Sequence, residues 1–304
     1  MKIIRPTVIT DAMLTHTDIA ETDYDEYNPA TTYGDGDNVM ETAVGIHHNY
    51  ESLQAGNVGH TLTDTAWWLD LGATNRWQVF DAKTGSQTTA TGASMHYDLT
   101  PGEVIDAIAL LNLDATSVQI VGDDPVAGEI YNESYNLVTT VPVLDWYMYW
   151  FEPIIRATDL VKTDLATIGI PPYTAAVWTI TITNTDSIAA CGEIVIGLQA
   201  TLGALEYGAE AGIVDYSTKT ADAYGNFTIT ERAYSKRNSY DVTVFNTAVN
   251  EVFRLLSVYR ATALVWVGHE DYTMFIVYGF YKDFRIGMRY PAYSIMTIDI
   301  EGLA

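Results

Sequence analysis

The sequence predicts a mainly β protein: an antiparallel β-sandwich of jelly-roll type, preceded by a small all-β insert and followed by an α+β part. Tyrosine occurs 21 times, and Thr, Val and Ile recur throughout, which favours strands over helices. Apolar and polar residues alternate with a period of two in several stretches, and turn-forming stretches such as TPG, GDDP and TNTDS separate them. We therefore divide the chain into an N-terminal segment (1–23), the insert (24–75), the sandwich (76–204) and the C-terminal part (205–304).

The insert contains two short candidate strands, around residues 39–40 and 49–53, separated by Gly, Asn and Asp clusters. Directly before the first of these strands, the stretch TTYGDGDNV (residues 31–39) places Asp35 and Asp37 on either side of a glycine, as a calcium-binding loop does. An EF-hand also needs a glutamate at the twelfth position, and counting from Asp35 that position is Ile46. The stretch therefore predicts a turn between strands.

The sandwich is predicted from strands with two kinds of pattern. In AVWTITITNT the residues Trp178, Ile180 and Ile182 lie on one face of the predicted strand, and threonines occupy the other. GEIVIGLQ alternates in the same way. EVIDAIALLNL and SVQIVG are more continuously apolar, as expected of strands in a sandwich core.

The C-terminal part is predicted to combine strands with one helix. GIVDYST, GNFTITERAY and SYDVTVFN are typical of consecutive antiparallel strands, and ALVWVG, TMFIVYGFYKDFRIG and YSIMTIDIEG of later ones. Residues 247–260 are predicted to form an amphipathic helix. The apolar residues at helical spacing there are Val249, Val252, Phe253, Leu256 and Tyr259.

Charge and composition exclude several classes of function. Asp and Glu number 39 against 15 Lys and Arg, which gives a formal charge of −24. Such a surface repels phosphate backbones, so we expect no nucleic-acid partner. No stretch approaches 18 apolar residues, so we expect no membrane insertion. The single cysteine, Cys191, lies in an apolar stretch, and we predict that it is buried. With only one cysteine, an intramolecular disulfide cannot form.

The sequence contains no motif that predicts catalysis, a cofactor or a metal. It has no H-E-x-x-H or Cys/His spacing for zinc, no Walker loop, no G-x-S-x-G and no G-x-G-x-x-G after a strand. Glycoside hydrolases use a pair of carboxylates, but with 39 acidic residues in the chain the sequence does not indicate which two would form such a pair. We therefore expect a protein that is not an enzyme and that binds neither cofactor nor metal.

The insert resembles the family 5/12 carbohydrate-binding modules, the small chitin-binding domains of chitinases. The matching positions are Tyr33, Gly36, Asp37, Val39, Gly45, Tyr50, Trp68 and Gly72. The resemblance implies that Gly36 and Asp37 shape a turn and that Trp68 packs in a small core with Tyr33 and Tyr50. Chitin-binding members carry two adjacent tryptophans after the second tyrosine, where this chain has SLQAGN. Trp67 is then the candidate replacement for sugar stacking, and the alternative is that it packs against the neighbouring sandwich.

A second candidate surface is the aromatic stretch DWYMYWFEP, residues 145–153, which we predict as a strand. Alternation would place Trp146 and Trp150 on one face and Tyr147, Tyr149 and Phe151 on the other. A row of exposed rings could stack on successive sugars, which makes Tyr147 and Tyr149 candidate carbohydrate-binding residues together with Trp67. Burial on both faces, or a subunit interface, explains the stretch at least as well.

The chain as a whole resembles a group of tailed-bacteriophage virion proteins found among tail and baseplate genes. The stretches that carry this resemblance are MKIIRPTVITDAML, AWWLDLGATNRW, DWYMYWFEP and YGFYKDFRIGMRYPAYS. It implies a structural component of the distal tail or baseplate that is assembled in the bacterial cytoplasm and presents the insert for attachment to host-surface glycans. Other tail proteins and copies of the chain itself would be its partners. The alternatives are a tail-associated polysaccharide depolymerase and a head or neck decoration protein.

Overall fold

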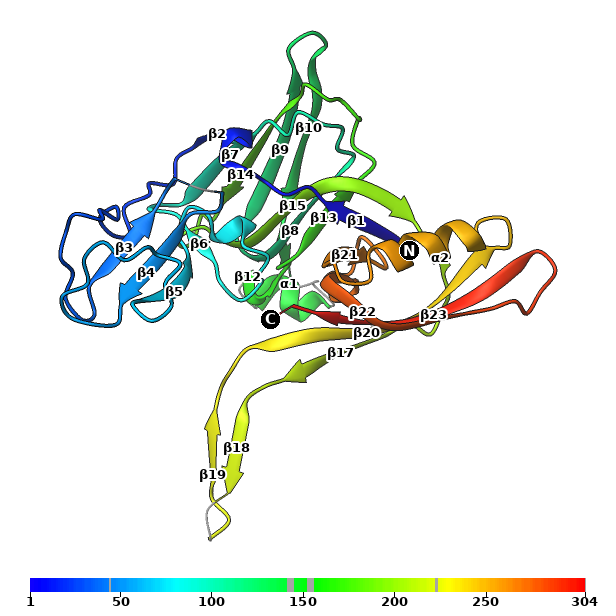
Figure 1. Cartoon of the computed structure of the whole chain (residues 1–304). Coiled ribbons are helices and arrows are strands. Elements are labelled where there is room, and N and C mark those ends of the chain that lie inside the picture. Colours follow the sequence, from blue (N-terminus) through cyan, green and yellow to red (C-terminus); the bar gives the residue numbers. More distant parts are fainter. Residues whose placement is uncertain (44, 141–144, 152–155, 222–223, 304) are drawn as a thin grey trace.

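The computed structural model describes residues 1–43, 45–140, 145–151, 156–221 and 224–303. Strands account for 49% of the residues and helices for 8%, which confirms the mainly β, sandwich-like fold class. Two curved antiparallel sheets form the body, and a small three-stranded unit and several long hairpins extend from it (Figure 1). In the described ranges, no helix has the length and apolarity needed to cross a lipid bilayer.

The larger sheet is continuous from the sandwich to the C-terminal part. In spatial order it consists of β13 (Leu165–Ile168), β8 (Ala107–Asp114), β15 (Ala190–Thr201), β1 (Lys2–Pro6), β21 (Leu264–Val267), β22 (Ile276–Gly287), β23 (Tyr293–Gly302), β20 (Tyr234–Phe245) and β16 (Ala204–Leu205). Strands β6 (Thr88–Thr89) and β17 (Glu210–Asp215) pair with β15 and β20 respectively. The N-terminal strand β1 joins the two halves, because it pairs with β15 on one side and with β21 on the other. The division into ranges 76–204 and 205–304 stays a prediction, since a shared sheet does not show which segments fold alone.

The smaller sheet closes the sandwich over strands β8 and β15. It has the order β10 (Gly128–Asn136), β9 (Ser117–Asp124), β14 (Val177–Thr183), β7 (Ser94–Leu99) and β2 (Leu14–Thr17). Trp178, Ile180 and Ile182 are fully buried between the sheets, as their alternation predicted. Cys191 is buried in the same core.

Helix α2 (Val249–Val258) confirms the predicted helix and covers the other half of the large sheet. Its residues Val249, Val252 and Leu256 belong to a core with Trp266 and Met296 from the sheet below. One residue of the predicted apolar face is misplaced, because Phe253 points outward and is 56% exposed. Short 3₁₀ helices lie at Asp11–Met13 (η1), Gln78–Phe80 (η2) and Thr273–Phe275 (η3).

The insert forms a separate three-stranded sheet at the side of the body (Figure 1). Its strands are β3 (Asn38–Glu41), β4 (His48–Ser52) and β5 (Trp68–Ala73). Both strands expected in the insert are present, and the third carries the closing tryptophan.

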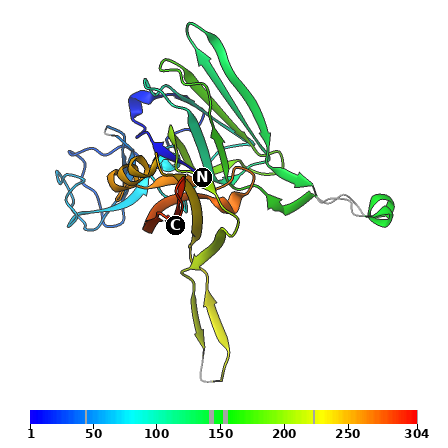
Figure 2. The same cartoon turned by 90° about the vertical axis from the view of Figure 1, so that its right-hand side faces the viewer.

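Two ribbons project from the body (Figure 2). Strands β18 (Thr218–Ala221) and β19 (Phe227–Thr230) form one arm, and β11 (Val138–Thr140) with β12 (Arg156–Val161) forms the base of the other, which carries helix α1 (Trp146–Phe151). The prediction of a strand over the aromatic stretch is wrong for Trp146–Phe151, and residues 152–153 lie outside the described ranges. In a helix, residues four apart lie on the same side, so their rings can come into contact. In a strand, adjacent side chains point to opposite faces, so their rings cannot. Trp146 stacks on Trp150 at 6.5 Å, and Tyr147 lies 5.3 Å from Phe151, between ring centroids.

Candidate functional site

A cavity of about 280 Å³ lies where the sandwich meets the C-terminal strands. Its lining combines apolar residues with a few polar ones: Thr84, Gly85, Leu111, Asn112, Thr163, Asp164, Ala233, Tyr234, Lys236, Ile276, Val277, Tyr278, Gly302 and Leu303. A concave site with converging polar groups is the usual first candidate for ligand binding. The hydrogen bonds of those polar groups therefore decide what the cavity can do.

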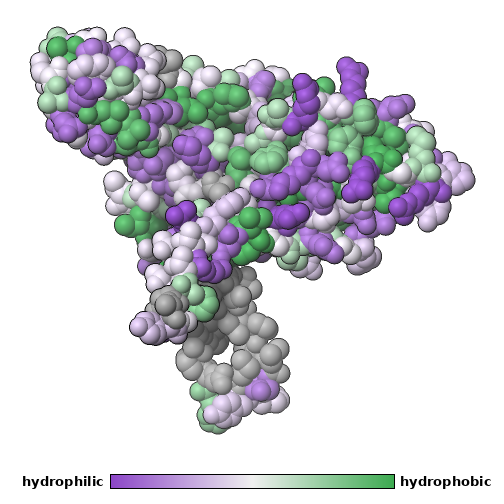
Figure 3. All heavy atoms as spheres, turned by 60° about the horizontal axis from the view of Figure 1, so that its bottom comes forward, coloured by the Kyte–Doolittle hydropathy of each residue, from purple (hydrophilic) through white to green (hydrophobic). Residues whose placement is uncertain are grey.

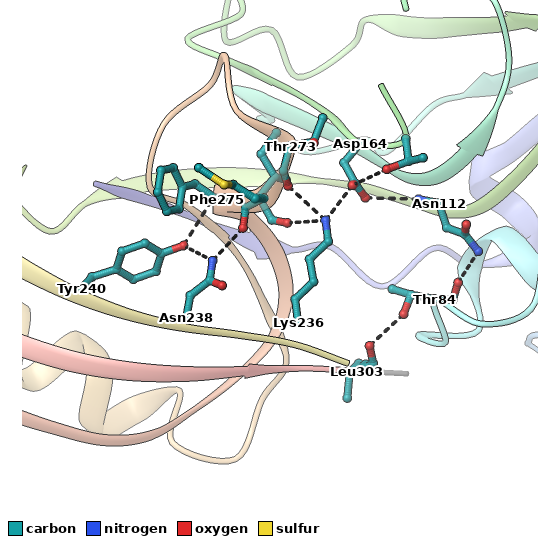
Figure 4. Close-up of polar contacts among 12 residues, drawn as sticks. Thr84, Asn112, Asp164, Lys236, Asn238, Tyr240, Thr273, Phe275 and Leu303 are labelled. Atoms are coloured by element: carbon teal, nitrogen blue, oxygen red, sulfur yellow. Dashed lines mark hydrogen bonds and ion pairs between the residues drawn. The ribbon is translucent and has the colours of Figure 1, made fainter. Parts of the chain in front are cut away.

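The charged pair of the cavity is Lys236 with Asp164, and both are fully engaged with the protein (Figure 4). The Lys236 Nζ lies 2.6 Å from Asp164 Oδ2 and donates to the backbone oxygens of Thr273 at 3.0 Å and Ile276 at 3.1 Å. These three acceptors match the three N–H donors of an ammonium group. The Asp164 carboxylate also accepts from the Asn112 backbone N–H and the Thr163 hydroxyl. No free donor remains on Lys236 to hold a ligand.

A second chain of hydrogen bonds ties the C-terminus to the sandwich beside this pair. The Asn112 side chain donates to the Thr84 backbone oxygen at 2.6 Å, and the Thr84 hydroxyl donates to the Leu303 oxygen at 2.9 Å. Asn112 has a φ of 50°, a left-handed backbone that asparagine tolerates better than most residues. The polar residues of the cavity thus connect segments far apart in the sequence, which is a structural use of buried polar groups.

Glu193 and Asp81 form a buried acidic pair next to this region. Glu193 is 4% exposed, and burial followed by the charge of Asp81 raises the pKa of its carboxyl to about 9. Burial likewise raises the pKa of Asp81. Glu193 is therefore a neutral acid at pH 7, and its Oε2 accepts from the Ala82 backbone N–H at 3.1 Å. Neither carboxyl is among the described side chains that line the cavity, although Tyr278 of the lining has its pKa raised by burial and by these two charges.

The Asp35–Asp37 stretch forms the predicted turn. Gly36 has a φ of 83°, and the Asp37 carboxylate accepts from the Gly34 backbone N–H at 2.6 Å. The backbone then returns to β4, since the Ser52 N–H donates to the Asp37 oxygen at 2.8 Å. Over the described ranges, no group of three or more His, Cys, Asp or Glu side chains could hold a metal ion.

The insert has the small core that its sequence predicted. Val39, Leu62 and Trp68 are buried, and Tyr33 and Tyr50 pack against them while remaining partly exposed. The Trp68 indole N–H donates to the His60 oxygen at 3.0 Å, and its ring meets the Tyr33 ring edge-on at 5.3 Å. Trp68 is thus a core residue.

Trp67 is partly exposed and stacks on His60 of the same insert, with ring centroids 3.9 Å apart. It packs against the insert's own core, so the alternative of packing against the sandwich is wrong. One edge of the insert is also apolar, because Leu69 and Leu71 on the edge strand β5 are 47% and 44% exposed.

The insert is anchored to the body by two carboxylates of the N-terminal segment. Glu21 accepts from the Thr74 hydroxyl at 2.6 Å and lies 2.8 Å from His47 Nδ1. Asp23 accepts from the Asn49 side chain and from the Asn75 backbone N–H. These contacts join the segment before the insert to the middle of the insert and to its C-terminal end.

Helix α1 is the most exposed aromatic cluster in the described part of the chain. Trp146, Tyr147, Tyr149, Trp150 and Phe151 are 74%, 64%, 61%, 65% and 74% exposed. Burial of this stretch, one of the two explanations expected, is therefore wrong within the single chain. Figure 2 places α1 and the insert on opposite sides of the body, so Tyr147 and Tyr149 do not share a site with Trp67.

Other projecting segments also carry exposed apolar side chains. On the β18–β19 arm, Phe227 and Ile229 are 70% and 66% exposed, and beyond β22 Met288 and Tyr290 are 74% and 47% exposed. Figure 3 shows hydrophobic residues at several separate places on one face, among hydrophilic ones. Sequence reasoning predicted a strand in GNFTITERAY, where β19 lies, but it did not predict that this strand projects from the body.

Comparison with known proteins gives no match, either to the model of a protein family or to a curated protein.

Proposed function

We propose that the chain is a structural subunit of a bacteriophage tail, at the distal tail or baseplate, whose projecting segments are covered by neighbouring subunits. The observation that carries the proposal is the set of large apolar side chains exposed on α1, on the β18–β19 arm and beyond β22. Monomeric soluble proteins seldom expose such clusters, which mark contact surfaces. The whole-chain resemblance described above supplies the setting.

The stability of the arms supports the same proposal. A two-stranded ribbon is marginally stable alone in water, and all eight residues of β18 and β19 are exposed. Contact with a neighbour would bury Phe227 and Ile229 and order the arm. The Lys236 ammonium group at the cavity, by contrast, already has three acceptors within the chain and leaves no donor for a substrate.

The insert is proposed to serve host attachment through glycans. Trp67, stacked on His60, is its candidate sugar-stacking residue, and Tyr147 and Tyr149 are the candidates on α1. Attachment by many copies needs only weak binding per site, since linked sites raise avidity by about 10²–10⁴-fold. The proposed partners are therefore tail proteins, further copies of the chain and host-surface glycans.

The proposed location can be tested on intact particles. Antibodies raised against the purified chain should decorate the tail tip of virions whose genome encodes it, and a reconstruction should place the chain there. Decoration of the head or neck would support the decoration-protein alternative, and absence from purified virions would refute a virion role.

The attachment role has separate tests. Phage with residues 24–75 deleted should assemble but adsorb more slowly, and an unchanged adsorption rate would refute attachment by the insert. On this proposal the chain is not an enzyme. Purified protein should then release no reducing sugar from host capsule or lipopolysaccharide, and release would support the depolymerase alternative.

A further inference from the structure

Helix α1 exposes enough apolar surface for one side of a stable interface. Each aromatic side chain buries about 150–250 Å² when covered, and the five rings are roughly two-thirds exposed. Covering them would bury on the order of 500–800 Å², close to the roughly 800 Å² that each partner contributes to a standard interface. The five rings lie on one six-residue helix at the end of a ribbon, where the body does not cover them (Figure 2).

The charge distribution indicates what covers this helix. Residues 1–204 contain 6 Lys and Arg against 27 Asp and Glu, whereas residues 205–304 contain 9 against 12. The first range therefore has a net charge of −21 and the second only −3. Helix α1 belongs to the acidic range, and its sequence, WYMYWF, lies between Asp145 and Glu152 and contains no basic residue. The C-terminal part holds 9 of the 15 Lys and Arg and is nearly neutral, so it is the part of the same protein that repels this acidic segment least.

The outer face of α2 offers an exposed apolar surface in this part. Phe253 and Val258 are 56% and 61% exposed there, and Phe253 lies 5.7 Å from Phe284 of β22 between ring centroids. Arg254 and Val258, four residues apart, lie on the same side of the helix. Arg254 is exposed, and among the described residues it has no hydrogen-bond or ion-pair partner. Exposed aromatic rings beside a guanidinium group suit a Trp- and Tyr-rich partner, because arginine stacks on aromatic faces.

We infer that α1 of one copy docks on the α2–β22 face of a second copy, the face formed by Phe253, Arg254, Val258 and Phe284. This inference rests on the proposed function and names the surfaces through which copies of the subunit meet. Within one chain α1 lies at the far end of its ribbon, away from α2 (Figure 2). The contact joins two different surfaces, so it is heterologous and generates a ring or a filament rather than a closed pair.

Two double variants of the full chain test the contact by sedimentation. Trp146→Ser with Trp150→Ser removes two rings of α1, and Phe253→Ser with Arg254→Glu disrupts the α2–β22 face. Wild-type protein should associate beyond dimers as its concentration rises, and each variant alone should be monomeric, with dissociation constants raised roughly 100-fold or more. An equimolar mixture should form a one-to-one dimer and nothing larger, since each variant keeps the surface that the other lacks.

The control is Val126→Ser, which changes a residue that is 94% exposed on the β9–β10 hairpin and should leave association unchanged. All substituted side chains are exposed, so thermal melting should match wild type and show that each variant is folded. A monomeric wild type, association of the α1 variant at wild-type strength, or a mixture that stays monomeric would each overturn the inference. These results do not depend on where the chain lies in a virion, so a failed contact and a failed virion assignment are separate outcomes.

Discussion

The Lys236 ammonium group lies 2.6 Å from the Asp164 carboxylate, and this contact joins strand β20 to the residue that precedes β13. The side chain of Asp164 is 7% exposed and that of Lys236 is 24% exposed, so the pair is largely removed from water. It links the sandwich to the C-terminal strands at the cavity.

Lys236→Met should therefore destabilise the protein by about 3 kcal/mol, the lower end for a broken buried pair because Lys236 is partly exposed. The cost arises because the Asp164 carboxylate stays buried without its cation. Denaturant unfolding measures the change, and Lys236→Met combined with Asp164→Leu should recover part of it. Lys219→Met is the matched control, because Lys219 pairs with Asp215 at a similar 2.7 Å on an exposed arm and should show no measurable loss. Equal stability of Lys236→Met and wild type would contradict the structural role of the pair.

Glu193 should make stability fall with rising pH. The unfolded chain releases this proton near the ordinary pKa of 4.5, and the folded chain holds it to a pKa of about 9. Between these values the unfolded state binds fewer protons, so the contribution of Glu193 is fully present below about pH 4.5 and is lost as pH rises through about 9. Asp81, whose pKa burial also raises, acts in the same direction.

Glu193→Gln keeps a neutral side chain of the same shape and should flatten this decline between pH 5 and 9, measured as the urea midpoint at each pH. The exposed Glu133→Gln should leave the profile as in wild type. A Glu193→Gln profile as steep as that of wild type would show that other groups set the pH dependence.

Trp68→Ala should unfold the insert while leaving the body intact. The residue is 2% exposed and contacts the rings of Tyr27 and Tyr33, so its loss should cost about 3–5 kcal/mol in a very small core. Limited proteolysis should then cut within residues 24–75 and spare the two large sheets. Leu69→Ala, at a 47% exposed neighbour, is the control and should remain resistant. Wild-type resistance of Trp68→Ala would mean that this ring does not hold the insert together.

Trp67→Ala should weaken glycan binding without disturbing the fold. We expect wild-type affinity on the order of millimolar for host lipopolysaccharide fragments, and a marked loss when the ring stacked on His60 is removed. Leu71→Ala, at a 44% exposed residue of the same insert, is the control. Tyr147→Ala with Tyr149→Ala tests the separate aromatic site on α1. Undiminished binding by the Trp67 variant would remove this residue from the candidate site.

Removing residues 218–230 and joining the ends with two glycines should leave the melting temperature unchanged. Every residue of β18 and β19 is exposed, so the body loses no buried area. Calorimetry provides the measurement. A lower melting temperature would show that the arm stabilises the isolated chain rather than a contact with a neighbour.

Local pattern in the sequence was enough to predict the fold class, the strand β14 and the helix α2. Alternation at Trp178, Ile180 and Ile182 and helical spacing at Val252 and Leu256 each reflect burial of one face, which a single element reveals by itself. The turn at Gly36 was predicted in the same way, from residues close in sequence, whereas the core role of Trp68 was implied by the resemblance to carbohydrate-binding modules.

Tertiary structure decided what depends on contacts between distant residues. Strand β1 pairs with both β15 and β21, and Lys236 meets Asp164 across 72 positions of sequence. No local pattern records such partners, because the free energy of pairing comes from groups that only folding brings together. The same reason explains α1: six bulky residues in a row fit a buried strand, an exposed strand or a helix equally well by pattern. The ring contacts Trp146–Trp150 and Tyr147–Phe151 belong to the helix, and the position of its ribbon, clear of the body, left those rings exposed.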